Sequence, residues 1–100
     1  MNVLAEIHII PLGVGVSLGD YIAACEKVLK DAGLKPQLHA YGTNVEGDWD
    51  TVMGALKQCH STLHEMGVPR ISTSVKLGTR TDKADSLGDR VKRVQARLGP

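Results

Sequence analysis

The first residues of the chain alternate between apolar and mixed positions, as side chains do on the two faces of a β-strand. Val3, Ala5, Ile7 and Ile9 fall on the apolar side, and Leu4, Glu6, His8 and Ile10 fall on the mixed side. A second alternation places Ile71, Thr73, Val75 and Leu77 opposite Ser72, Ser74 and Lys76. These patterns predict strands over 3–12 and 70–77, and shorter apolar runs predict two more, over 35–40 and 43–46.

Three other segments place apolar residues three and four positions apart, which is typical of a helix with one buried face. The stripes are Leu18, Tyr21, Ile22, Cys25, Val28, Leu29 and Ala32; then Val52, Met53, Leu56, Cys59, Leu63 and Met66; and last Leu87, Val91, Val94 and Leu98. Each stripe follows a residue that can cap a helix, namely Ser17, Asp48 or Ser86. Gly33 and Gly67 should end the first two helices. We expect all three stripes to face inward.

The predicted order of elements is β-α-β-β-α-β with an extra C-terminal helix, which is the pattern of ferredoxin-like α+β folds. In that topology the four-stranded antiparallel sheet has its first and third strands in the centre, and two helices cover one face. The chain of 100 residues has room for one domain, which we take to span residues 1–100. The other face of the sheet is expected to be uncovered.

The uncovered face should collect most of the polar side chains of the sheet. Its predicted members are Glu6, His8, Gln37, His39, Asn44, Glu46, Ser72, Ser74 and Lys76, whereas Leu38, Ala40, Val45 and Val75 should point towards the helices. The face is either simply hydrated, as is common in antiparallel sheets, or an interface for a ligand or a second subunit. Its carboxylates, hydroxyls and amide would suit a cationic or amine-bearing small molecule.

The composition narrows the classes of function. Aromatic residues make up 3% of the chain and phenylalanine is absent, so a stacking surface for single-stranded nucleic acid is not expected. The net charge of +1 gives no field that would attract a phosphate backbone. The N-terminus has neither a basic leader nor a long apolar run, and there are only 2 cysteines, so we expect a cytoplasmic protein with no membrane contact.

Histidine and cysteine pairs give weaker signals. His60 and His64 have the spacing of zinc ligands on a helix, but no acidic residue lies between them. A partly exposed helix surface is the simpler interpretation, and we predict no metal site. Cys25 and Cys59 fall on apolar stripes and are expected to be small core residues, not nucleophiles.

Two further segments leave alternatives open. The run Gly13-Val14-Gly15 could cradle a phosphate at a helix N-terminus, but it lacks the other residues of the known phosphate-binding fingerprints, which favours a plain turn. From Arg80 onward the basic residues are Arg80, Lys83, Arg90, Lys92, Arg93 and Arg97, against Asp82, Asp85 and Asp89. This excess indicates either a hydrated helix face or a contact with acidic residues of a second subunit.

Several segments carry a resemblance to a known family. They are Val3–Gly13, Tyr41–Asp48, Val52-Met53, Cys59-His60, Met66–Ile71 and the polar strand from Lys76 to Arg80. The most specific of them is the Gly-Thr-x-x-Glu-Gly motif from Gly42 to Gly47. Together they resemble the small thiamine-binding protein family, also called YkoF-like. The resemblance implies a ferredoxin-like fold, assembly as a dimer of dimers, and non-enzymatic binding of thiamine or its hydroxymethylpyrimidine part, in thiamine salvage, transport or sensing.

The ligand implied by this resemblance carries a fixed positive charge and an aminopyrimidine edge, so a carboxylate beside amide and hydroxyl groups would suit it. The residues expected to bind it are Glu46 and Asn44 first, then Thr43, Glu6, Ser72 and Ser74, with His8 able to hydrogen-bond or stack. No catalytic residue, metal or further cofactor is expected.

Two other functions compete with this one. The chain could be a regulatory or interaction module whose polar sheet face is only a subunit interface. It could also be a small hydrolase of the acylphosphatase type, but that reaction needs an arginine in the loop after the first strand. No arginine lies between Leu12 and Ser17, which disfavours the hydrolase.

Overall fold

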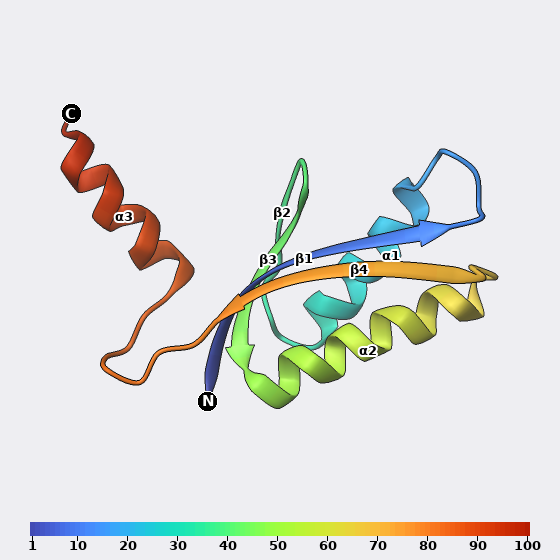
Figure 1. Ribbon diagram of the computed structural model, residues 1–100, viewed down its shortest axis with the longest axis horizontal. Helices are drawn as coiled ribbons and strands as arrows, with labels where there is room; N and C mark the ends of the chain where they lie inside the picture. Colours follow the sequence, from blue (N-terminus) through green and yellow to red (C-terminus); the bar gives the residue numbers. More distant parts are fainter.

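The computed structural model describes all residues, 1–100, as four strands and three helices (Figure 1). The elements are β1 (Asn2–Leu12), α1 (Gly19–Asp31), β2 (Gln37–His39), β3 (Gly42–Asp48), α2 (Trp49–Glu65), β4 (Arg70–Gly78) and α3 (Leu87–Leu98). The strands form one antiparallel sheet in the order β2-β3-β1-β4. The predicted α+β ferredoxin-like architecture with an additional C-terminal helix is therefore confirmed.

The hydrophobic core lies between the sheet and the pair α1 and α2. The sheet contributes the apolar side of β1 together with Val45, and the helices contribute Cys25, Leu29, Val52, Ala55, Cys59 and Leu63. This confirms the alternation predicted for β1. Leu38 and Ala40, expected to point inward, are exposed. They lie in and beside β2, a three-residue strand at the edge of the sheet, where the helices do not cover them.

β2 is shorter than the predicted strand because the backbone before it is not extended. Lys35 has a φ of 49°, in the left-handed region, and Pro36 has no N–H to donate to the sheet. The strand therefore begins only at Gln37.

Two of the three predicted helix caps are present. The Asp48 carboxylate accepts a hydrogen bond from the Asp50 N–H at 3.2 Å, and the Ser86 hydroxyl accepts one from the Asp89 N–H at 3.0 Å. The cap predicted at Ser17 is wrong. Leu18 occupies the cap position of α1 with nearly helical angles and makes no side-chain cap bond. Ser17 therefore lies one residue too early to bond the first free N–H groups.

The C-terminal helix α3 projects away from the rest of the molecule (Figure 1). None of its residues is buried, so the inward-facing stripe predicted for it is wrong: Val91, Val94 and Leu98 are exposed. Their spacing is amphipathic, but no other element of the chain lies against them. Helical spacing shows that a face can be buried, not which surface buries it.

Polar contacts hold the start of α3. Asp85, whose side chain is 3% exposed, accepts hydrogen bonds from Arg90 Nε and Arg93 Nη2, both at 2.7 Å. Arg80 Nη1 lies 3.6 Å from the same carboxylate. The Arg90 guanidinium, followed by Arg93, holds the pKa of Asp85 well below its usual range. Asp85 is therefore ionised at neutral pH and fixes three guanidinium groups around itself.

Candidate functional site

A mostly apolar groove lies on the helix side of the sheet, between α1 and the β2–β3 hairpin. It arises because β3 pairs with β1 only as far as Thr43 opposite Ile7, whereas β1 continues to Leu12 along β4. The resulting cavity has a volume of about 380 Å³, within the range of small-molecule sites. Nine of its 14 lining residues are hydrophobic: Ile7, Ile9, Ile10, Leu18, Ile22, Cys25, Leu29, Leu38 and Ala40.

One polar pair lies among these apolar walls. The Thr43 hydroxyl donates a hydrogen bond to the carboxylate of Glu26, which α1 brings across from the other side of the groove. Thr43 is 6% exposed and Glu26 is half-buried. Glu26 takes part in none of the salt bridges of the structure, so its negative charge has no cationic partner. A half-buried carboxylate without a counter-charge is suited to a cationic ligand.

Gly42 keeps the hairpin close to β1 at the edge of the groove. Its φ is 155°, and a Cβ added there would lie 2.8 Å from the Ile7 carbonyl oxygen. Any side chain would push the hairpin away from β1. The glycine that begins the most specific motif of the sequence therefore has a structural reason: it sets the width of the groove.

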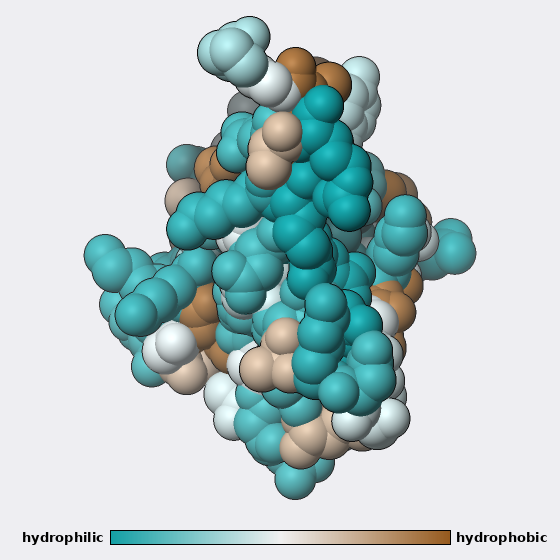
Figure 2. All heavy atoms as spheres, turned by 90° about the vertical axis from the view of Figure 1, so that its left-hand side faces the viewer, coloured by the Kyte–Doolittle hydropathy of each residue, from teal (hydrophilic) through white to brown (hydrophobic).

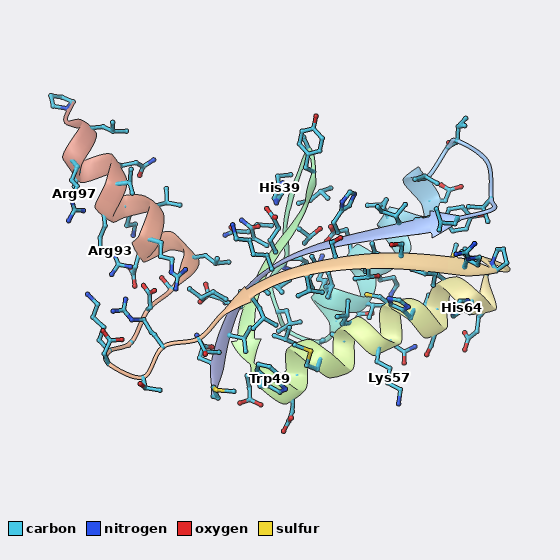
Figure 3. All side chains as sticks on the ribbon, viewed as in Figure 1. His39, Trp49, Lys57, His64, Arg93 and Arg97 are labelled. Carbon is cyan, nitrogen blue, oxygen red and sulfur yellow. The ribbon has the colours of Figure 1, made fainter.

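A second polar cluster lies on the opposite, open face of the sheet. His39 Nε2 lies 3.1 Å from Asn44 Oδ1 and 3.4 Å from Glu6 Oε2. Glu6 is directly opposite Asn44 on β3 and opposite Lys76 on β4. Figure 3 shows His39 on the β2–β3 hairpin. A recess of about 270 Å³ there is lined by Glu6, Asn44 and Lys76, and also by Leu87 and Arg90 of α3.

The structure divides five of the seven predicted ligand-binding residues among three cavities. Thr43 and His8 line the groove, and Glu6 and Asn44 line the recess of the open face. Glu46 lines a separate hollow with Lys35 and Gln37. Ser72 and Ser74 lie on β4 opposite Ile10 and His8 and line none of the three. One ligand bound in the groove would therefore contact two of the seven predicted residues.

Sequence reasoning missed Glu26. The sequence contains only a weak indication of its role. Glu26 follows Cys25 and lies four positions after Ile22 and three before Leu29, so its carboxylate lies at the edge of the apolar face of the helix. Only the tertiary structure shows that this part of α1 faces Thr43 across a groove and not solvent.

The histidines and cysteines of α1 and α2 have partners within the protein. His60 Nε2 lies 2.7 Å from the Thr73 hydroxyl, and His64 Nδ1 lies 2.7 Å from the Val68 carbonyl oxygen. Cys25 and Cys59 are buried and face each other between α1 and α2. Hydrogen bonding with Cys25, followed by burial, raises the pKa of the Cys59 thiol, which stays protonated and is a poor nucleophile.

None of the helices is both long and apolar enough to cross a bilayer.

Comparison with known proteins gives consistent matches over almost the whole chain. The family model described as "Thiamine-binding protein" matches residues 5–95. The UPF0045 protein sll0230 of Synechocystis is 54% identical over 98 residues, which cover 98% of this chain and 81% of that protein. The UPF0045 protein ECM15 of Eremothecium gossypii is 40% identical, with 98% and 94% covered. The crystal structure of MJ1052 from Methanocaldococcus jannaschii matches with a TM-score of 0.87 at 37% identity, covering 94% of this chain and 96% of that one.

Proposed function

Because this chain belongs to the thiamine-binding protein family, we propose that it binds thiamine, or the hydroxymethylpyrimidine part of thiamine, in the groove between α1 and the β2–β3 hairpin. In this proposal the protein is a cytoplasmic binding protein without catalytic activity, which serves thiamine salvage, transport or sensing. No metal or additional cofactor takes part.

The observation that carries the proposal is the pair of Glu26 and Thr43 within apolar walls. Thiamine has two flat rings that favour an apolar slot, and its thiazolium ring has a fixed positive charge. The Glu26 carboxylate would supply the opposite charge or accept a hydrogen bond from the aminopyrimidine, and Thr43 would hold that carboxylate in place. His8 and the backbone groups of β1 beyond its pairing with β3 border the same groove.

The open face is the second candidate for the same ligand. Glu6 and Asn44 with His39 form a hydrogen-bonding cluster there, and Glu46, Ser72 and Ser74 are predicted to add to it. Two observations favour the groove. Its walls are mostly apolar, whereas four of the nine residues around the open-face recess are hydrophobic. Glu6 already has His39 beside it, and Lys76 lies opposite it, whereas Glu26 has no cation.

Titration calorimetry tests the proposed function directly. We expect thiamine and hydroxymethylpyrimidine each to give a saturable heat with the folded protein, whereas choline, a cation without the pyrimidine ring, should give none at the same concentration. Absence of heat with thiamine at millimolar concentration, while circular dichroism shows a folded chain, would contradict the proposal. The regulatory-module alternative, in which the open face is only a subunit interface, would then be favoured.

The exposed apolar stripe of α3 supports a further part of the proposal, a homo-oligomer built as a dimer of dimers. Val91, Val94 and Leu98 are 56%, 58% and 78% exposed, and no other element of the same chain lies against them. A second copy could bury them, since exposed apolar stripes at helical spacing are typical of contact surfaces.

Light scattering after size exclusion measures this assembly. We expect the native chain to have a mass several times 10.7 kDa, and the double variant Val91→Lys, Val94→Lys to have a lower mass, because two buried charges would oppose the contact. The matched control is Ala96→Lys, which adds a charge to the exposed side of α3 opposite the stripe and should leave the mass unchanged. A native mass of 10.7 kDa at 100 μM chain would contradict the oligomer.

A further inference from the structure

Another recess, different from the recess of the open face, lies at the end of the sheet away from the groove. It is formed where β4 ends and the chain turns into α3, and its volume is about 230 Å³. Asn2 and Thr79 contribute an amide and a hydroxyl, and the charged lining residues are Arg80, Lys83, Asp85 and Arg90. No residue of this recess also lines the groove. Figure 2, which views the molecule from this end, shows a predominantly hydrophilic surface.

The charges around this recess are unequal. The residues that line it carry three positive groups, Arg80, Lys83 and Arg90, against one carboxylate, Asp85, and the ion pairs of these residues add Asp82 and Arg93. Asp82 accepts a hydrogen bond from Arg80 Nε at 2.6 Å and points to solvent, with its side chain 65% exposed. Arg80 lowers the pKa of Asp82 to about 2, so both carboxylates are ionised at neutral pH, and the cluster still keeps an excess of positive charge.

Asp85 fixes the side chains of Arg90 and Arg93 but accepts only one hydrogen bond from each. Its two oxygens engage Arg90 through Nε and Arg93 through Nη2, each at 2.7 Å. Each guanidinium has five N–H groups, so most of them stay available. A nearly buried carboxylate that fixes arginine side chains reduces the entropy they lose when they bind a ligand. Lys83 takes part in none of the salt bridges, so its ammonium group is free.

We propose that this recess is a binding site for a phosphate group, either inorganic phosphate or the phosphate of a small monoester, held by Arg80, Lys83 and Arg90 with Thr79 as a hydroxyl donor. Guanidinium groups match the oxygens of phosphate in geometry and charge, and lysine adds a mobile charge. The site is independent of the thiamine groove in position and in chemistry. Whether or not thiamine binds in the groove therefore leaves it unaffected.

The test is a titration of the ¹⁵N-labelled native protein with sodium phosphate at constant ionic strength, followed by its amide spectrum. We expect saturable shifts centred on Thr79, Lys83 and Arg90, while the amides of Glu26 and Thr43 in the groove stay in place. Glycerol phosphate in a second titration distinguishes a monoester site from one that takes only the free ion. Shifts with inorganic phosphate alone would assign the site to the free ion, and shifts with both would assign it to the phosphate group in general.

Two variants distinguish phosphate binding in the recess from nonspecific attraction by the positive charge of this region. Lys83→Ala should weaken phosphate binding about tenfold, because it removes a charged donor without breaking an ion pair of the fold. Lys92→Ala removes the same charge from α3 outside the recess and should leave binding unchanged. Equal weakening by the two variants, or no saturable shift in the native protein, would overturn the proposal.

Discussion

Replacing Glu26 by glutamine is expected to weaken thiamine binding about ten- to a hundredfold, because a hydrogen bond to a charged group contributes about 1.5–3 kcal/mol. Glutamine keeps an oxygen that can accept the hydrogen bond from Thr43, so the groove should keep its shape and lose only its negative charge. Titration calorimetry with thiamine measures the change in the dissociation constant, and the urea midpoint verifies that the variant is as stable as the native chain.

Three further Glu→Gln variants test whether the loss of binding is specific to Glu26. Glu65→Gln removes a carboxylate at the end of α2, outside the groove, and should leave binding unchanged. Glu6→Gln and Glu46→Gln remove the carboxylates of the open face and of its neighbouring hollow. If either of these weakens binding tenfold while Glu26→Gln does not, the ligand lies on the open face, and the proposal for the groove is wrong.

Truncating Leu63 to alanine is expected to lower the free energy of unfolding by about 3 kcal/mol, within the range of about 2–5 kcal/mol for buried leucines. Leu63 is 0% exposed, and its side chain is part of the core that joins α2 to the sheet. The core has no phenylalanine to fill a gap, so the lost volume should remain largely as a cavity. Urea denaturation at one fixed protein concentration measures the loss, because assembly would otherwise alter the apparent stability.

Leu38→Ala is the matched control for this measurement. Leu38 is 62% exposed on β2, so the same change of side chain should alter the free energy of unfolding by less than about 0.5 kcal/mol without ligand. Equal losses for Leu38 and Leu63 would show that the core is not arranged as described.

The elements whose positions could be predicted from the sequence are those fixed by local rules. β1 and β4 follow from alternation, since successive side chains of a strand point to opposite faces. The caps at Asp48 and Ser86 follow from side chains that bond N–H groups two or three residues away. Ser17, the third predicted cap, caps no helix, because α1 begins at Gly19 with Leu18 in the cap position and its side chain lining the groove.

The candidate site was predicted only in part because it depends on where strands stop pairing. The sequence singled out Thr43 and the glycine before it, but the same reasoning placed the ligand on the open face with Glu46 and Asn44. The groove exists because β3 ends its pairing with β1 at Thr43 and because α1 crosses beneath the gap. No local sequence pattern shows at which residue two strands stop pairing. The sequence therefore could not predict that Glu26 contacts Thr43.

The sequence by itself determined the family, the order of the elements, the topology of the sheet and the aliphatic composition of the core. The elements and their order depend on periodicity and capping, whose physical causes act within a few residues, and the sheet topology and the family follow from the resemblance of that order and of short motifs to a known family. Only the tertiary structure decided that Glu26 meets Thr43 in a groove, that three arginines surround Asp85, and that α3 leaves its apolar stripe exposed. Those features join residues that are distant in the sequence or depend on a partner surface, and they arise only when the packing of the whole chain is fixed.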